Sequence, residues 1–282
     1  EETAVKVTVL SAMAAAKGMK KGEGQSFLIR SGDRSLLYGF GADETAMENM
    51  ARLRISPDVV DTGFLASGLP ADAGGLIPFM RENRRADIYA RVNAFDPRYK
   101  KWLFGLKDIS PDKRLRSFRR ILRCKNYFAE KDGSFVTFSL SAEDGAPSPA
   151  ERTYYRRDEE GRAVRDDFTH EMYLLVRGAD KRWTLFCGDA HAGLASVVRN
   201  ASALIGRSLG GTLDAVVGGM YMPDGRDMPA YNGYIDEAAD ALVGSGARFY
   251  AGNETGVYAR TRLSIALGEK FGAFAAGETL EL

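Results

Sequence analysis

Short apolar and alternating runs divide the chain into predicted strands, and stretches with helical spacing separate them. Runs bounded by turn residues predict strands at residues 5–10, 26–29, 35–40, 59–65, 87–92, 134–140, 172–176, 183–187, 213–217, 248–251 and 279–282. Apolar residues three or four positions apart predict helices at residues 43–54, 74–83, 194–207, 232–243 and 257–271. Strands and helices alternate through both halves, which predicts an α/β fold of two sheets packed face to face with helices outside.

The most informative stretch runs from residue 183 to residue 200. An apolar strand is predicted up to Cys187, a tight turn over residues 188–193, and a helix from Leu194. His191 therefore lies on a turn between a strand and a helix, where side chains are exposed and the helix N-terminus offers free N–H donors. The chain has only two histidines. The other, His170, precedes a strand, and we expect it at the surface or at a strand edge.

A basic segment interrupts the pattern. Residues 98–125 hold eleven Lys or Arg and two Asp, together with Tyr99, Trp102, Phe104 and Phe118. Clustered cations beside exposed aromatic rings are typical of an RNA-binding or anion-binding surface. The simpler interpretation is an insertion with one basic amphipathic helix at residues 112–123. We assign residues 94–128 to a basic insertion within a single domain that spans residues 1–282.

Composition narrows the functional classes. The 39 basic and 38 acidic residues give a net charge of +1, which argues against a surface built throughout for nucleic acid. The two cysteines provide neither a disulfide framework nor a metal-binding pair, and we expect Cys187 in the core. No apolar run approaches the roughly 20 residues of a membrane span, so we expect no membrane partner. The chain begins without Met, through a trimmed tag or a cleaved signal; we expect a cytoplasmic protein, with export as the alternative.

Three motifs carry a resemblance to a known family. They are DDF at residues 166–168, GDAHAGL at residues 188–194 and DAVVGGMY at residues 214–221. Together they resemble the metallo-β-lactamase superfamily, and more narrowly the branch known as dihydropterin-ribofuranosylaminobenzene-phosphate synthase. The resemblance covers nearly the whole chain, with the basic segment matched least. It implies a four-layer αββα sandwich.

The resemblance also implies a metal site that this chain has altered. Members of the superfamily hold one or two metal ions, usually zinc, in a groove at the sheet edges. The first ligands come from a His-x-His-x-Asp-His run. In this chain Ser67 and Leu69 occupy the places of the first two histidines, Ala71 that of the aspartate, and Asp72 that of the last histidine. Only Asp72 among these four is a good metal ligand.

The other implied ligand positions are also mostly replaced. His191 is retained, whereas Asn253 and Tyr221 stand where the family has histidines. Residues 38–41 replace an element that carries an aspartate in the family. Asp189 and Glu254 replace family cysteines and add carboxylates to the same groove. Since a catalytic zinc usually has three protein ligands, we expect the two-metal hydrolytic mechanism to be absent.

Three functional hypotheses remain. The first is a metal-free pseudoenzyme whose groove binds a small molecule or a protein partner; its lining residues are Ser67, Asp72, Asp189, His191, Tyr221, Asn253 and Glu254. The second is a re-tooled enzyme, hydrolase-like or a pterin-related transferase or synthase, with His191, Asp189 and Glu254 as catalytic candidates. Its site would act without metal or would hold one divalent ion, with Asp72 and His191 as residual ligands. The third, nucleic-acid binding through the basic insertion, has the least support. No cofactor is expected under the first hypothesis.

Overall fold

Two seven-stranded sheets form the centre of the computed structural model, which describes residues 4–149, 151–223 and 225–282. The expectation drawn from the missing N-terminal Met concerns residues 1–3, which lie outside the described ranges. In the first sheet the strand order is β18-β1-β2-β3-β4-β5-β8. Its strands are β1 (Lys6–Ser11), β2 (Ser26–Ser31), β3 (Arg34–Tyr38), β4 (Thr62–Phe64), β5 (Asp87–Arg91), β8 (Ile121–Cys124) and β18 (Thr279–Glu281).

The second sheet has the order β17-β16-β15-β14-β13-β10-β9. Its strands are β9 (Tyr127–Ala129), β10 (Phe135–Phe138), β13 (Tyr173–Arg177), β14 (Arg182–Gly188), β15 (Thr212–Gly218), β16 (Arg248–Ala251) and β17 (Phe271–Ala273). The strands β14, β15, β16 and β17 are parallel to one another, as are β3, β4, β5 and β8.

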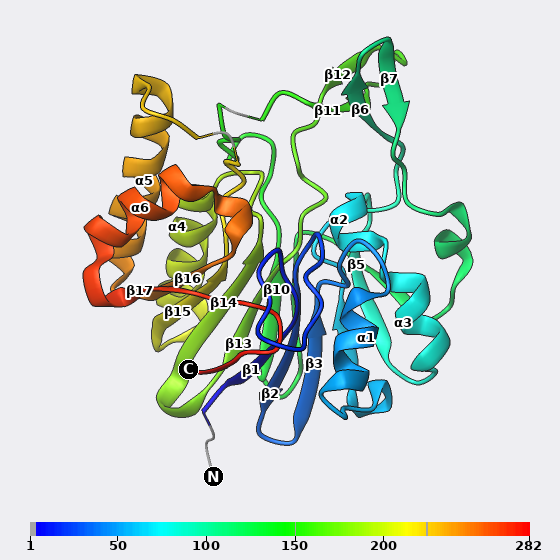
Figure 1. The fold of residues 1–282 in the computed structure, drawn as a ribbon, viewed down its shortest axis with the longest axis vertical. Coiled ribbons are helices and arrows are strands. Elements are labelled where there is room, and N and C mark those ends of the chain that lie inside the picture. Colours follow the sequence, from blue (N-terminus) through cyan, green and yellow to red (C-terminus); the bar gives the residue numbers. More distant parts are fainter. Residues whose placement is uncertain (1–3, 150, 224) are drawn as a thin grey trace.

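Helices cover the outer face of each sheet (Figure 1). On the first sheet lie α1 (Thr45–Arg52), α2 (Pro70–Ala73) and α3 (Leu76–Glu82); on the second lie α4 (Leu194–Leu204), α5 (Pro229–Ser245) and α6 (Val257–Leu267). Short helical turns complete the chain: η1 (Pro57–Val59), η2 (Lys113–Ser117), η3 (Ala179–Lys181), η4 (Ile205–Leu209), η5 (Asn253–Thr255) and η6 (Gly268–Lys270). No helix in the described ranges is long and apolar enough to cross a bilayer.

The sandwich follows from strands that bury both faces. In β2, Phe27 and Ile29 pack between the two sheets, while Leu28 packs toward α1 and α3. Successive side chains of a strand point to opposite faces, so an uninterrupted apolar run places one set in the central layer and one under the helices. This arrangement confirms the predicted α/β fold of two face-to-face sheets with helices outside.

A third, smaller sheet stands above the sandwich (Figure 1). It has the order β12-β11-β6-β7 and consists of β6 (Arg98–Trp102), β7 (Gly105–Asp108), β11 (Tyr154–Arg157) and β12 (Ala163–Arg165). Half of it comes from the basic segment and half from residues 154–165, for which the pattern predicted no strand. The sequence pattern did not predict this pairing, because the two hairpins meet only in the folded chain.

The predicted basic helix at residues 112–123 is wrong. The segment forms η2 and then β8, which pairs with β5 at the edge of the first sheet. Arg116 donates to the carbonyl oxygen of Phe95, and Arg120 donates to those of Met80, Asn83 and Ala86. These side chains thus satisfy backbone carbonyls of neighbouring loops, which favours the irregular path over a helix.

Candidate functional site

The candidate site lies at one edge of the sandwich, where parallel strands end. The loops after β4, β14, β15 and β16 supply the residues predicted from the sequence. The carboxyl ends of parallel strands meet at a common edge, so residues far apart in the chain converge there. Asp72, Asp189, His191 and Glu254 interact electrostatically, and each has less than a tenth of its surface exposed. The predicted convergence is therefore present, and its four residues are buried.

Asp72 is held by its own loop. Ser67 Oγ donates to Asp72 Oδ2, and Leu69 N donates to Ser67 Oγ over 3.1 Å. Burial raises the pKa of Asp72. Leu69 itself points into the core beneath the second sheet's helices. In residues 67–72, where the resemblance implies the first metal ligands, Ser67 and Asp72 thus hydrogen-bond to each other and Leu69 packs into the core.

Asp189 and Glu254 form a pair of buried carboxyl groups. Gln25 Nε2 donates to Asp189 Oδ1 over 2.8 Å, whereas neither oxygen of Glu254 has a hydrogen-bond partner of good geometry among the described residues. Burial raises the pKa of both, and the charge of Glu254 raises that of Asp189 further. A Cβ at Gly252 would lie 2.5 Å from Glu254 Oε2, so a glycine there leaves room for this carboxylate.

His191 is buried among aromatic and acidic side chains. Its Nδ1 lies 3.2 Å from Glu151 Oε2, and its ring stacks on Phe168 with centroids 5.0 Å apart. The rings of Tyr221 and Tyr154 lie 4.6 and 5.7 Å from it. Burial lowers the pKa of His191, but the hydrogen bond to Glu151 and the nearby carboxylates outweigh it and raise the pKa to about 9. The imidazole is thus held as a cation at neutral pH.

Glu171 fixes the turn that carries His191. Its two carboxylate oxygens accept hydrogen bonds from His191 N and Ala192 N, each over 2.9 Å. Tyr173 donates to one of them over 2.5 Å. Two N–H donors of the turn that precedes α4 therefore serve an internal carboxylate. Neither Glu171 nor Glu151 was singled out from the sequence, because acidic residues in a charged stretch give no signal of burial.

The predicted turn itself is present. Gly188 and Gly193 adopt positive φ angles of 56° and 110°, and Ala190 adopts 42°. A Cβ at Gly193 would overlap the carbonyl oxygen of Ala146, so close approach requires glycine there. Tyr221 and Asn253 are half-buried at the rim, with Asn253 at the start of η5.

The residues at the edge do not fit the family's metal centre. No three His, Cys, Asp or Glu side chains in the described ranges are arranged to hold a metal ion. Asp72, Asp189 and His191 each have a protein partner, and Leu69 and Ala71 carry no side-chain donor. Of the four donors that converge, only Glu254 lacks a side-chain hydrogen-bond partner in the described ranges, whereas a catalytic zinc typically has three protein ligands.

His170 is fully buried, which corrects the expectation of a surface residue. Its Nδ1 accepts a hydrogen bond from Gly68 N over 3.0 Å, and its Nε2 lies 3.5 Å from Asp166 Oδ2. Arg98 Nε lies 3.1 Å from the same oxygen. Burial and the charge of Arg98 lower the pKa of His170 to about 4, so it is neutral at physiological pH. This buried triad ties the small sheet to the sandwich.

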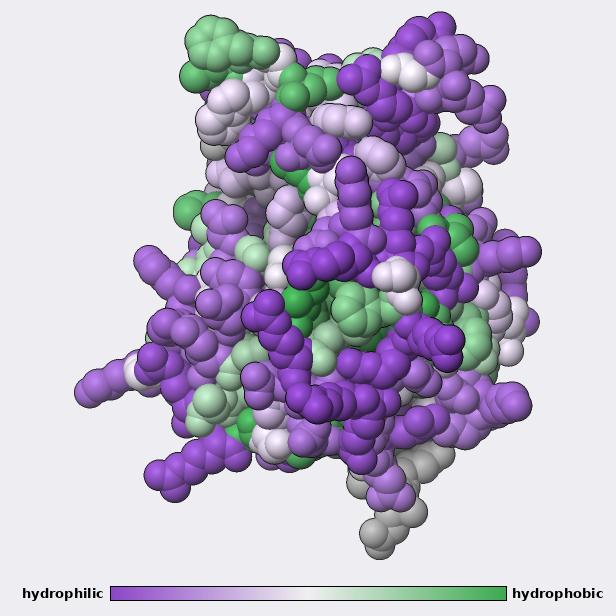
Figure 2. Space-filling view, turned by 90° about the vertical axis from the view of Figure 1, so that its right-hand side faces the viewer, coloured by the Kyte–Doolittle hydropathy of each residue, from purple (hydrophilic) through white to green (hydrophobic). Residues whose placement is uncertain are grey.

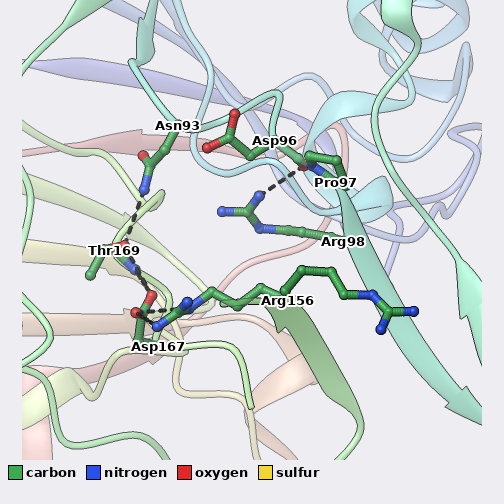
Figure 3. Close-up of a pocket in the computed structure, with 8 residues that line it drawn as sticks. Asn93, Asp96, Pro97, Arg98, Arg156, Asp167 and Thr169 are labelled. Atoms are coloured by element: carbon green, nitrogen blue, oxygen red, sulfur yellow. Dashed lines mark hydrogen bonds and ion pairs between the residues drawn. The ribbon is translucent and has the colours of Figure 1, made fainter. Parts of the chain in front are cut away.

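Two pockets lie where the small sheet meets the sandwich. One, of about 300 Å³, is bordered by Glu151, Tyr154 and Phe168, three of the four residues that surround His191. The other, of about 430 Å³, is shown in Figure 3. There the Arg156 guanidinium meets Asp167, while Arg98 lies between Asp96 and Arg156 and donates to the carbonyl oxygen of Asp96. Most of its charged groups are already paired within the protein.

No protein-family model matches the chain, and no curated protein matches its sequence. Among solved structures it is similar to Tm1679, described as a metal-dependent hydrolase of the β-lactamase superfamily, with a TM-score of 0.78, 18% identity and 99% of each chain covered. It is also similar to the metallo-β-lactamase fold protein YhfI from Bacillus subtilis (TM-score 0.60, 11% identity, 99% of this chain and 100% of that one). Unliganded yeast PDE1 gives a TM-score of 0.59 at 10% identity, with 99% and 100% covered. At these identities the similarity concerns the fold alone. The protein thus has the metallo-β-lactamase fold.

Proposed function

We propose that this protein is a pseudoenzyme of the metallo-β-lactamase fold, a binding protein that does not hydrolyse a substrate through metal ions. One observation carries the proposal. Three of the four donors that converge at the sheet edge are engaged by a protein side chain: Asp72 Oδ2 by Ser67, Asp189 Oδ1 by Gln25, and His191 Nδ1 by Glu151. The ligands of a metal site are hydrogen-bonded by neighbouring groups as well. Leu69 and Ala71, however, offer no donor atom where the resemblance implies a histidine and an aspartate.

Metal binding would have to disrupt these buried contacts. Only the contact between His191 and Glu151 is a charged pair, and losing one partner of a buried charged pair costs about 3–5 kcal/mol. An imidazole must also be neutral to ligate a metal, and the surrounding carboxylates favour its protonated form. Both effects favour the metal-free arrangement.

The pocket of about 300 Å³ next to His191 is the proposed ligand site. It is at the small end of the range for sites that take small organic molecules. Tyr154 and Phe168 offer flat apolar surface, and Arg152 and Arg165 offer positive charge. These features favour a compact ligand with a ring and an anionic group over a protein segment.

The test is elemental analysis of protein purified without chelator and offered zinc, manganese and iron. We expect background metal in the wild type and in His191→Ala. Near-stoichiometric metal that is lost in His191→Ala would overturn the proposal. Because His191→Ala opens a buried site, Asp72→Asn serves as a second, nearly isosteric variant.

Ligand binding is tested by the shift of the melting temperature with a panel of small aromatic carboxylates and phosphates. We expect stabilisation of the wild type that Arg152→Gln weakens. Arg182→Gln, an exposed arginine at the start of β14, is the matched control. No shift with any member of the panel would argue for a protein partner.

A second candidate, a metal-free acid–base enzyme, is favoured by Glu254. Its oxygens have no side-chain hydrogen-bond partner in the described ranges, and its pKa is raised by burial and by the charge of Asp72. Two carboxyl groups that share a site can divide acid and base roles between them. Turnover of nitrophenyl esters or phosphate esters in the presence of chelator, lost in Glu254→Gln, would favour this candidate.

Nucleic-acid binding has weaker support. Arg98, Arg116 and Arg120 direct their guanidinium groups to carbonyls or carboxylates of the protein itself. The basic segment therefore presents fewer free cations than its composition indicates. Affinity for RNA that falls steeply with salt would restore this candidate.

A further inference from the structure

The tip of the β6–β7 hairpin presents three consecutive large apolar side chains to solvent. Trp102 is 58% exposed, Leu103 84% and Phe104 97%. Large apolar residues exposed singly are common, but a contiguous group marks a contact surface. Figure 1 places this hairpin at the far end of the small sheet, well above the sandwich, and Figure 2 shows an apolar projection at an upper corner of the molecule.

Lysines surround this tip. Lys100 and Lys101 precede it on β6, and Lys107 follows it on β7 with its Nζ 5.6 Å from the Trp102 ring centroid. The nearby acidic residue, Asp108, accepts hydrogen bonds from Ser110 N and Oγ at the base of the hairpin. The end of the hairpin therefore combines an apolar tip with a basic ring, formed by Lys100, Lys101 and Lys107.

The hairpin is anchored at its base. β6 pairs with β11 through Arg98↔Arg156, Tyr99↔Tyr155 and Lys100↔Tyr154. Arg98 is buried against Asp166 at the edge of the sandwich. The protein thus holds the apolar tip away from its own surface, where folding alone gives no reason to place it.

We propose that this tip docks on an anionic lipid surface, with Trp102, Leu103 and Phe104 entering the interface and the lysines contacting the headgroups. An apolar face with Trp, Phe and Leu beside Lys is the composition of interfacial membrane anchors. Lysines near an anionic leaflet add attraction that salt weakens. This goes beyond the pseudoenzyme proposal and does not depend on it.

The shape and chemistry favour lipid over two other partners. A convex tip needs a partner surface that deforms around it or one that already has a matching cavity. A lipid bilayer surface is fluid and deforms. Leu103, the central residue of the tip, has no ring to stack on a nucleic-acid base. The expectation of no membrane partner rested on the lack of a spanning segment, and docking on a surface needs none.

Binding is measured by co-sedimentation of the full chain with vesicles of phosphatidylcholine alone and of phosphatidylcholine with phosphatidylserine. We expect binding to the anionic vesicles that weakens as salt is raised. Leu103→Ser and Phe104→Ser should each lower the partition coefficient about tenfold, because each removes one large side chain from the apolar phase. Ile265→Ser is the matched control, since Ile265 is 79% exposed on α6 and should leave binding unchanged.

The contribution of the basic ring and the insertion of Trp102 into the bilayer are tested separately. Lys101→Gln and Lys107→Gln should weaken binding to anionic vesicles, and Lys17→Gln, an exposed lysine elsewhere, should not. The chain has two tryptophans, and Trp183 is buried. A blue shift of tryptophan emission on adding vesicles, absent in Trp102→Phe, would therefore report insertion of the tip.

The variants lie on exposed positions, so circular dichroism and melting temperature should match the wild type and confirm folding. Wild type that stays in solution with both kinds of vesicle would overturn the proposal. Sedimentation that Leu103→Ser, Phe104→Ser and Ile265→Ser leave equally unchanged would also overturn it. Binding of single-stranded RNA that the tip variants abolish, without vesicle binding, would replace lipid by nucleic acid as the occupant.

Discussion

Lowering the pH should destabilise this protein through one buried histidine. In the fold His170 accepts a hydrogen bond from Gly68 N at Nδ1 and lies near Arg98, so protonation would break the bond and place two cations together. Its pKa falls from 6.5 to about 4 on folding, because burial and the charge of Arg98 both disfavour the imidazolium. Between these two pH values the unfolded chain binds a proton that the native protein does not.

The sign and size follow from this difference. A depressed native pKa gives stability that is fully present above pH 6.5 and is lost as the pH falls toward 4. The gap between the two values corresponds to about 3 kcal/mol at about 1.4 kcal/mol per pH unit. Buried carboxyl groups with raised pKa, such as Asp189 and Glu254, bind protons in the native state and act in the opposite direction. The contribution of His170 must therefore be measured as a difference between variants.

His170→Asn supplies that difference. The Asn side-chain oxygen can replace Nδ1 as the acceptor for Gly68 N–H, but it does not titrate. Urea unfolding followed by tryptophan fluorescence should be measured at a series of pH values between 7 and 4. Relative to wild type, the variant should gain about 3 kcal/mol of unfolding free energy over that window. Parallel stability profiles for the two proteins would refute the reasoning.

Three further predictions concern the same region. His191 has a pKa raised to about 9, so its stabilisation is complete below pH 6.5 and is lost as the pH rises toward 9; His191→Gln should remove this alkaline loss in the same unfolding assay. Gly193→Ala should lower the free energy of unfolding by about 2 kcal/mol or more, because φ is 110° and a Cβ would overlap a backbone carbonyl oxygen. Gly233→Ala, which has open space in α5, should instead raise it by about 0.5–1 kcal/mol. Calorimetry would distinguish the two variants. Arg98→Met should lower the free energy of unfolding by about 3–5 kcal/mol, because it leaves the buried Asp166 carboxylate unpaired. Arg162→Met breaks only exposed ion pairs and should lower it by less than about 1 kcal/mol. Equal losses in denaturant unfolding would contradict this prediction.

The sequence pattern predicted two sheets packed face to face with helices outside, and the turn between a strand and a helix that carries His191. Local patterns sufficed because a strand with both faces apolar, as in 26–31, needs a layer on each side. The same is true of the turn at residues 188–193, where glycines at positive φ connect a buried strand to a helix. These features depend on residues that are neighbours in the sequence, so local sequence patterns are enough to predict them.

Only the tertiary structure decided what the site residues do. Gln25, Glu151 and Glu171 reach Asp189 and His191 from segments that are 20 to 164 residues away in the sequence. The burial of His170 and the small sheet likewise arise from contacts between distant segments, through Arg98 and Asp166. The sequence therefore determined which side chains meet at the sheet edge. Their partners, burial and protonation depend on three-dimensional proximity, which no local pattern encodes.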